Sequence, residues 1–549
     1  MKTSLQNSPS RDARFGLLAY AAFCLVLTIY VACITPFRSE MLLADAWEHH
    51  AAVLTLSDNL WTPGNPTYAT EDPSIRYSPY SVGLAILCQQ AGITPYTALS
   101  IAAVLNTLGF FAVFWWLLRG FAMTSISLAA GLCIVLLYGE APGYANSFAL
   151  SDLPWHMVNP SAFSLMLNFF CWGLLWRVRS SSITPTVIAV FAAAVSLALS
   201  VLSHGMTGVL GAIGVILLVI AVDASQRTRV MVMVISVGVL SLALSVAWPW
   251  YRFTDAATGG HDPWYWFNPT ILQRMFFLWC APVYLSTLLA LPYRSEPLVR
   301  WSLAVSGVVI VLGIVSWLAQ SASLARLPLA ATPVACIAVG YWIKSVAPGL
   351  RGWTTQLLSG LLSRSASRNA QSLTQMLFLV ALLYGALPQF HAILSEPYLA
   401  RPLIAPLLKR EDKQPRIWST YQTVLAGVEP GEVVLSDMET GWPVPSFGGR
   451  IVAANHLELF SQGQRERLEE TERFFATQST KQQRAIEQQR ELIDRFAVRY
   501  ILVSRQTPLA SHVQDNAIVA ESNGLVLMDA RKWLAAQSDR QATPPSADR

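Results

Sequence analysis

The chain has 549 residues, of which 53% are hydrophobic and 13% are charged, with 19 Trp and a net charge of +5. A soluble globular protein would carry about 25% charged residues, so the composition excludes that class and predicts a polytopic membrane protein. The basic residues lie in short loops between apolar runs, which argues against a nucleic-acid partner. The seven cysteines form no CxxC pair, so the sequence predicts neither a disulfide framework nor a zinc site.

Hydropathy predicts about eleven transmembrane helices. The first apolar run, 16–37, is free of Lys, Glu, Asp and Arg and long enough to cross about 30 Å of hydrocarbon. Because it is too long for a signal peptide and lacks a small-residue cleavage pattern, we expect a retained anchor. The predicted spans lie near 16–37, 97–117, 122–139, 157–176, 183–203, 206–222, 230–249, 275–292, 301–319, 327–343 and 374–392.

The distribution of Lys and Arg predicts the orientation of these spans. Alternate loops on one side contain only Arg38, Arg76, Arg252, Arg274 and Arg326 before the C-terminal tail, whereas the remaining Lys and Arg residues up to position 393 fall on the N-terminal side. By the positive-inside rule the N-terminus is cytoplasmic. We therefore expect a multi-pass protein of the bacterial inner membrane, with the loop 38–96 and the tail in the periplasm.

The loop 38–96 contains an unusual cluster of ionisable residues, Asp45-Ala46-Trp47-Glu48-His49-His50, just outside the first span. Such groups are costly to desolvate near a membrane and mark a candidate site. The apolar piece 80–91 is too short to span, and we expect it to form an interfacial or re-entrant helix. A second outer loop, 251–273, is rich in Trp, Tyr, Gly and His and is typical of an interfacial lid.

The tail from residue 395 has more charge and shorter apolar runs than the preceding sequence. Four runs of strand length occur near 432–436, 450–454, 499–503 and 524–528, and 464–496 has helical spacing of apolar residues. These patterns predict a transmembrane domain over 1–394, a periplasmic α/β domain over 395–537 and a disordered tail over 538–549.

Several of these segments resemble the GT-C superfamily of membrane glycosyltransferases, and in particular its protein mannosyltransferase and aminoarabinose transferase type. The resemblance includes the acidic motif after the first span, Ser78-Pro79-Tyr80 before an interfacial helix, and the tail segments 440–450, 455–456, 473–475 and 496–503. It implies a GT-C-like fold and transfer of a sugar from a polyprenyl-phosphate carrier to a lipid, glycan or protein on the outer face.

Two carboxylates of the first loop are the candidate catalytic residues. Attack by an acceptor hydroxyl on an anomeric carbon requires a base, and nearby negative charge stabilises the cationic sugar in the transition state. Asp45 is the candidate base, because it lies nearest the membrane. Glu48 falls on the same face if 45–54 is helical, where it can bind the acceptor or tune the pKa of Asp45. The alternative is that Asp45 caps this helix and Glu48 completes a capping pair.

The departing phosphate requires cationic or hydrogen-bonding groups near the outer ends of other spans. Arg326, which opens the tenth span, is the first candidate, and its alternative role is snorkelling to the lipid headgroups. His204 and Arg76 are the second choices.

Three further side chains are predicted to contact donor or acceptor: His49, Asp152 and His156. No metal is assigned, and the resemblance leaves open whether a divalent ion such as Mg²⁺ or Mn²⁺ takes part.

The sequence therefore predicts a membrane glycosyltransferase that acts on cell-envelope glycans, with a lipid-linked donor rather than a nucleotide sugar, because no nucleotide-binding motif occurs in the tail. Two alternatives stay open. A polymerase or ligase of lipid-linked glycans shares the expected location. A transporter or flippase would also be polytopic, but it would place ionisable residues at mid-membrane.

Overall fold

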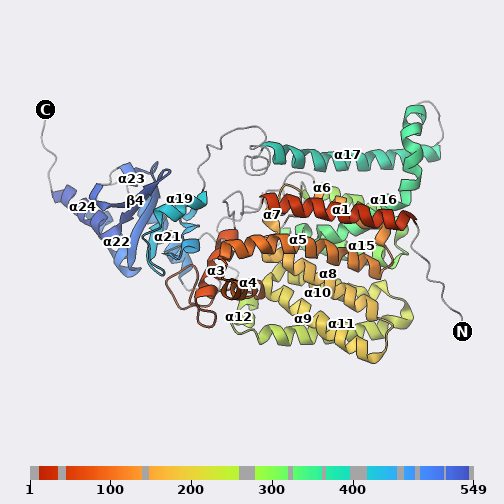
Figure 1. Cartoon of the computed structure of the whole chain (residues 1–549), viewed down its shortest axis with the longest axis horizontal. Helices are drawn as coiled ribbons and strands as arrows, with labels where there is room; N and C mark the ends of the chain where they lie inside the picture. The colour runs from red at the N-terminus through yellow and green to blue at the C-terminus, as the bar shows by residue number, and fades with distance from the viewer. Residues whose placement is uncertain are drawn as a thin grey trace. The chain divides into compact units, whose positions relative to one another are not determined.

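The computed structural model describes residues 11–34, 45–138, 147–258, 279–318, 326–360, 366–395, 417–453, 463–476, 483–511 and 515–542. The chain forms two compact units, each assembled from separated segments (Figure 1). The first unit comprises Met1–Thr35, Ser100–Ala247 and Tyr265–Arg410, and the second comprises Pro36–Leu99, Trp248–Trp264 and Glu411–Arg549.

The first unit is helical throughout its described part. Its elements are α1 (Arg11–Ile34), α5 (Pro95–Gly120, which begins in the second unit), η1 (Thr124–Ile126), α6 (Ser127–Leu136), α7 (Leu153–His156), α8 (Pro160–Val178), α9 (Ile183–Ser203), α10 (Gly205–Ala221), α11 (Ala224–Val246), α14 (Ala281–Thr287), η3 (Leu288–Tyr293), α15 (Pro297–Leu318), α16 (Leu327–Gly360) and α17 (Ala366–Ser395).

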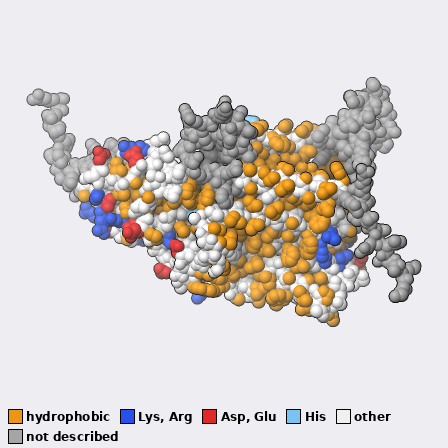
Figure 2. Space-filling model, viewed as in Figure 1, with side chains coloured by type: hydrophobic (Ala, Val, Ile, Leu, Met, Phe, Trp, Pro, Cys, Tyr) orange, Lys and Arg blue, Asp and Glu red, His pale blue; other side chains and the backbone are white. Residues whose placement is uncertain are grey.

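Seven of these helices are long and apolar enough to cross a membrane, and four shorter apolar stretches accompany them within the described residues. Each of the eleven predicted spans overlaps one of these stretches. On the side seen in Figure 2, hydrophobic side chains cover most of the described surface of this helical unit, as lipid contact requires. The chain is therefore a multi-pass membrane protein, as the composition predicted.

The helices of this unit approach one another closely at glycines. A Cβ atom at Gly208 would lie 2.5 Å from the Val201 Cα, and one at Gly340 would lie 2.9 Å from the Ala130 amide nitrogen. Buried polar side chains add interhelical hydrogen bonds, since the Trp172 indole donates to the Gly211 carbonyl at 2.9 Å. Close backbone approach and such hydrogen bonds hold helices together in lipid, where the hydrophobic effect gives no driving force.

The second unit combines the first polar loop with the C-terminal residues. From the loop come α3 (Ala46–Asp58) and α4 (Pro79–Ala91), and from the middle segment α12 (Phe253–Thr258). The C-terminal elements are α19 (Ile417–Val424), β1 (Val433–Ser436), α20 (Met438–Gly441), η5 (Val444–Phe447), β2 (Arg450–Ile451), α21 (Gln464–Ala476), α22 (Gln483–Arg495), β3 (Val498–Ser504), α23 (Pro508–Ser511), η7 (Asp515–Ala517), β4 (Ile518–Ser522), β5 (Leu525–Asp529) and α24 (Ala530–Ala542).

A five-stranded mixed sheet with the order β2-β1-β3-β5-β4 forms the centre of the C-terminal part. Strand β3 is buried on both faces, because Ile501 and Val503 belong to one core and Tyr500 and Leu502 to the other. The first core includes side chains from α22 and α24, and the second includes side chains from α19. Helices therefore cover both faces of the sheet, and the predicted α/β character is confirmed.

The elements of the tail differ from the sequence predictions in three details. The predicted helix over 464–496 is two helices, α21 and α22. Strand β4 was not predicted because its apolar run, Ile518-Val519-Ala520, is shorter than the strand-length runs used for the prediction. The predicted strand 450–454 is reduced to β2, and its last residue lies outside the described part. Helix α24 continues to Ala542, beyond the boundary set at 537, since the Ala- and Gln-rich sequence favours a helix.

Candidate active site

Asp45 occupies the N-cap position of α3. Its backbone carbonyl accepts the first helical hydrogen bond, from the His49 amide at 3.0 Å. Its side chain accepts no capping hydrogen bond at this end of the described helix. A capping role, the structural alternative for this carboxylate, therefore has no support in the geometry of the helix.

Glu48, in the first turn of α3, has two partners from distant parts of the sequence. Its carboxylate forms an ion pair with the Arg76 guanidinium and accepts a hydrogen bond from the Trp442 indole at 3.1 Å. The exposed fractions of the Glu48 and Arg76 side chains are only 11% and 17%. Because a buried carboxylate is stable only when it is paired, this arrangement fixes the position of Glu48.

The rest of α3 is packed into aromatic side chains of the C-terminal part. The Trp47 ring stacks on Trp418 with 5.8 Å between centroids, and Trp418 also contacts His50 edge-on at 5.1 Å and Tyr96 at 4.7 Å. Burial lowers the pKa of His50 to about 3, so its imidazole is neutral at physiological pH. His49 is buried as well, with 5% of its surface exposed.

The loop that follows α3 is folded against strand β2. The Asn65 side chain accepts the amides of Thr67 and Tyr68, both at 2.9 Å, and the Thr67 carbonyl accepts the Ile451 amide at 2.9 Å. Burial raises the pKa of Asp58, an effect that the positive charge of Arg450 opposes. The acidic loop and the tail motif 440–450 are therefore one structure, although nothing in their spacing indicated it.

Two predicted phosphate ligands lie at helix ends in the first unit. His204 is the N-cap of α10, where its Nδ1 atom accepts the Thr207 amide at 3.3 Å. Because Nδ1 is an acceptor, Nε2 is the nitrogen that carries the proton in the neutral ring. Arg326 directly precedes α16 and is partly buried.

Asp152 and His156 are buried one helical turn apart, at either end of α7, with exposed fractions of 4% and 1%. The His156 ring packs edge-on against Phe148 at 4.2 Å. Beside Asp152, the Ser151 amide and hydroxyl both donate to the Gln389 side-chain oxygen, at 3.0 and 2.9 Å. Gln389 was absent from the sequence predictions, because its position in α17 reads as an ordinary polar interruption of an apolar run.

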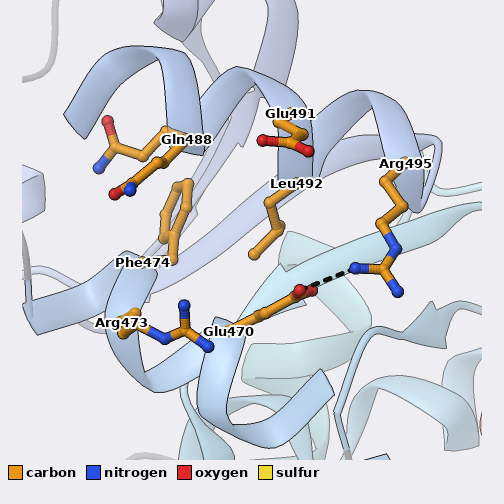
Figure 3. Close-up of a pocket in the computed structure, with 8 residues that line it drawn as sticks. Glu470, Arg473, Phe474, Gln488, Glu491, Leu492 and Arg495 are labelled. Atoms are coloured by element: carbon orange, nitrogen blue, oxygen red, sulfur yellow. Dashed lines mark hydrogen bonds and ion pairs between the residues drawn. The ribbon is translucent and has the colours of Figure 1, made fainter. Parts of the chain in front are cut away.

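Among the described residues, no group of three or more His, Cys, Asp or Glu side chains is placed to hold a metal ion. A polar hollow of about 170 Å³ lies between α21 and α22 (Figure 3). Three of its charged residues have partners, since Arg495 binds Glu470 at 2.8 Å and Arg473 donates to the Glu469 carbonyl. None of the predicted site residues lines it.

No protein-family model and no curated protein sequence matches the chain. Solved structures do match it. ArnT from Cupriavidus metallidurans, bound to undecaprenyl phosphate, superimposes with a TM-score of 0.54 at 12% identity, over 94% of this chain and 98% of that one. The fold is that of a GT-C glycosyltransferase.

Two further structures with this fold superimpose with similar scores. The archaeal oligosaccharyltransferase AglB from Archaeoglobus fulgidus, in complex with an inhibitory peptide and a dolichol-phosphate, gives a TM-score of 0.52 at 11% identity, over 88% of this chain and 69% of that one. The arabinofuranosyltransferase AftD from Mycobacteria gives 0.51 at 14% identity, over 95% of this chain and 40% of that one. The resemblance stated from the sequence is confirmed for the fold.

Proposed function

We propose that the chain transfers a sugar from a polyprenyl-phosphate-linked donor to a lipid, glycan or protein acceptor at the periplasmic face of the bacterial inner membrane. The fold supports this proposal, since ArnT and AglB were solved with undecaprenyl phosphate and dolichol-phosphate. The observation that carries it is Asp45, a carboxylate at the start of a buried helix, close in sequence to the end of the first membrane helix and not used as a cap.

In the proposed reaction, Asp45 takes the proton of the acceptor hydroxyl while the oxygen of that hydroxyl bonds to the anomeric carbon. The bond between that carbon and the phosphate oxygen breaks, and its electron pair leaves with the polyprenyl phosphate. Negative charge near the ring stabilises the cationic sugar in the transition state. A membrane-bound donor holds its reacting carbon close to the headgroups, where a loop that directly follows a span can reach it.

The other predicted residues take supporting roles in this proposal. Arg326 and His204 bind the donor phosphate, and His49, Asp152 and His156 contact donor or acceptor. Arg76 is a weaker phosphate ligand than its charge suggests, because its guanidinium is paired with Glu48. Glu48 in turn acts through that pair, by fixing the first turn of α3, rather than as a second base.

The experiment that tests the proposal compares glycans and lipids of a deletion strain that expresses either the wild type or Asp45→Asn. We expect the variant to insert normally and to fail to restore the missing sugar, since loss of a general base costs about 10²- to 10⁴-fold in rate. Glu71→Gln, an exposed acid of the same loop, is the control and should restore it. Full restoration by Asp45→Asn would remove Asp45 as the base.

Transfer of a whole lipid-linked oligosaccharide is the alternative, in keeping with the similarity to AglB. The purified protein distinguishes the two when it is supplied with polyprenyl-phosphate monosaccharides or with polyprenyl-linked oligosaccharides. Turnover of the monosaccharide donor supports the proposal. Turnover of the oligosaccharide donor alone favours the alternative.

A further inference from the structure

We infer that the tail segment 442–451, here called the docking segment, positions α3 and with it Asp45 for the reaction. The inference rests on the proposed function, in which Asp45 is the base. Two side chains make the decisive contacts: Trp442 donates from its indole to Glu48, and Ser446 donates from its hydroxyl to the Trp47 carbonyl at 2.8 Å. We assign both as positioning residues, because each hydrogen-bonds to the first turn of α3 and acts on Asp45 through that helix.

The contacts lie in the first turn of α3, immediately after Asp45. Since a helix rises 1.5 Å per residue, both contact points are within about 5 Å of Asp45 along the axis. The Phe447 ring lies 6.3 Å from the ring of Trp47 and adds an apolar contact on the same turn. A displacement of the docking segment would therefore move the carboxylate with it.

The residues that directly precede the docking segment, 437–441, are attached to the C-terminal sheet and to α19. The Asp437 side chain caps α20 by accepting the amides of Glu439 and Thr440, at 3.1 and 2.9 Å. The Tyr421 hydroxyl donates to the Thr440 carbonyl at 2.9 Å. A Cβ atom at Gly441 would lie 2.2 Å from the Ser436 hydroxyl, so the glycine allows the segment to approach β1 closely.

The far end of the segment is equally constrained. Gly448 has a φ of +89°, a backbone conformation that favours glycine, and the following residues enter strand β2. The Ile451 amide then binds the Thr67 carbonyl, beyond the C-terminal end of α3. The docking segment is thus attached to the first turn of α3 and to the loop that follows α3. The glycines of the motif 440–450 allow the close approach at Gly441 and the backbone conformation at Gly448 that this path requires.

Such positioning should affect turnover more than binding. A misplacement of about 1 Å in a reacting group can cost roughly 100-fold in rate. Trp442→Phe keeps most of the ring but removes the N–H, and Ser446→Ala removes only the hydroxyl. We expect each to lower kcat about 10- to 100-fold while the donor KM changes less than 3-fold.

A matched control is available in the same domain. Trp533 is also buried, but its indole nitrogen has no hydrogen-bond partner among the described residues. Trp533→Phe therefore makes the same chemical change without removing a hydrogen bond, and its kcat should stay within 2-fold of the wild type.

The test uses the full chain in lipid nanodiscs and two readouts. Hydrogen–deuterium exchange over residues 45–58 reports the order of α3 without any assumption about activity, and should rise several-fold in Trp442→Phe and Ser446→Ala but not in Trp533→Phe. Steady-state kinetics with a polyprenyl-phosphate monosaccharide as the donor then give kcat and the KM for that donor.

Two results would overturn the inference. In one, exchange over residues 45–58 is unchanged in both docking-segment variants. In the other, exchange rises but kcat does not fall. A failure of the proposed function is distinguishable, since Asp45→Asn would then keep its activity whatever the exchange of α3.

Discussion

The Ile451 amide donates to the Thr67 carbonyl at 2.9 Å, a hydrogen bond between residues of the C-terminal sheet and of the first polar loop. Ile451 lies in β2, at the edge of the sheet. Exposed edges offer unpaired backbone groups to other chains, and natural proteins cover them. Here the loop that carries the candidate base covers the edge. The hydrogen bond between Ile451 and Thr67 therefore both protects the sheet edge and holds the candidate site in place.

The Glu48–Arg76 ion pair predicts a large loss of stability when one partner is removed. Glu48→Gln removes the carboxylate that is paired with a mostly buried guanidinium. For a fully buried pair such a loss costs about 3–5 kcal/mol, and the 17% exposure of the Arg76 side chain places the expected loss near the lower value. Thermal unfolding of the purified protein measures it. The double variant Glu48→Gln/Arg76→Gln should recover part of the loss, and Glu71→Gln should have no effect. Equal stability of Glu48→Gln and wild type would contradict this prediction.

The low pKa of His50 predicts that stability falls in mild acid. The unfolded imidazole binds a proton near pH 6.5 and the folded one only near pH 3, so the unfolded state binds more protons between these values. Stability should therefore decrease as the pH falls below 6.5, by up to about 1.4 kcal/mol per pH unit, with no contribution from His50 above pH 7.

His50→Phe, which keeps an aromatic contact with Trp418, tests the origin of this dependence. Its melting temperature should change less than that of the wild type between pH 6.5 and 5. Asp58, whose raised pKa acts in the opposite direction, is present in both proteins, so its contribution cancels in the comparison. If the melting temperatures of the two proteins change equally with pH, a group other than His50 is responsible.

The contact between α16 and α6 predicts that Gly340 tolerates no larger side chain. A Cβ atom there would lie 2.8 Å from the Ala130 Cβ and 2.9 Å from its amide nitrogen, so Gly340→Val must push the helices apart. Overpacking of this kind costs about 1–3 kcal/mol. Gly307→Val in α15 is the control, because no atom lies within 4 Å of its added Cβ. The melting temperature in detergent should fall for the first variant only.

The proposed phosphate contact of Arg326 predicts an effect on donor binding. Arg326→Gln should raise the donor KM about 10-fold or more, since a hydrogen bond to a charged group contributes about 1.5–3 kcal/mol. Arg326→Lys should retain most of the affinity because it keeps the charge. If Arg326 only snorkels to the headgroups, both variants will bind the donor as the wild type does.

Much of the fold could be predicted because membrane helices and buried strands leave strong local patterns. Apolar length located all eleven hydrophobic stretches, and β3 was recognisable from a run that is buried on both faces. Strand β4 was missed, since only every other residue of Ile518–Ser522 is even partly buried at this sheet edge. The division into α21 and α22 was missed because both helices have the same dense Glu, Arg and Gln composition, which reads as one helical stretch.

The candidate site was less predictable, because its contacts join residues that are far apart in sequence. A helix around Glu48 was considered from the sequence, but its partner Trp442 is 394 residues away, and Arg76 was predicted only as a phosphate ligand. A buried carboxylate can take any of several partners, and a single sequence does not indicate which. The motif 440–450 was visible as a turn, whereas its attachment to α3 depends on the tertiary structure.

The separation of Glu48 from Trp442 also sets the order of events during synthesis. At about 5–20 residues per second, a ribosome needs roughly 20–80 s to pass from one to the other. During that interval Arg76 can already pair with Glu48, whereas the hydrogen bonds from Trp442 and Ser446 to α3 are still missing. A product terminated before Trp442 can thus acquire its hydrophobic helices and still lack these contacts to α3, so the candidate site is assembled only when translation is nearly complete.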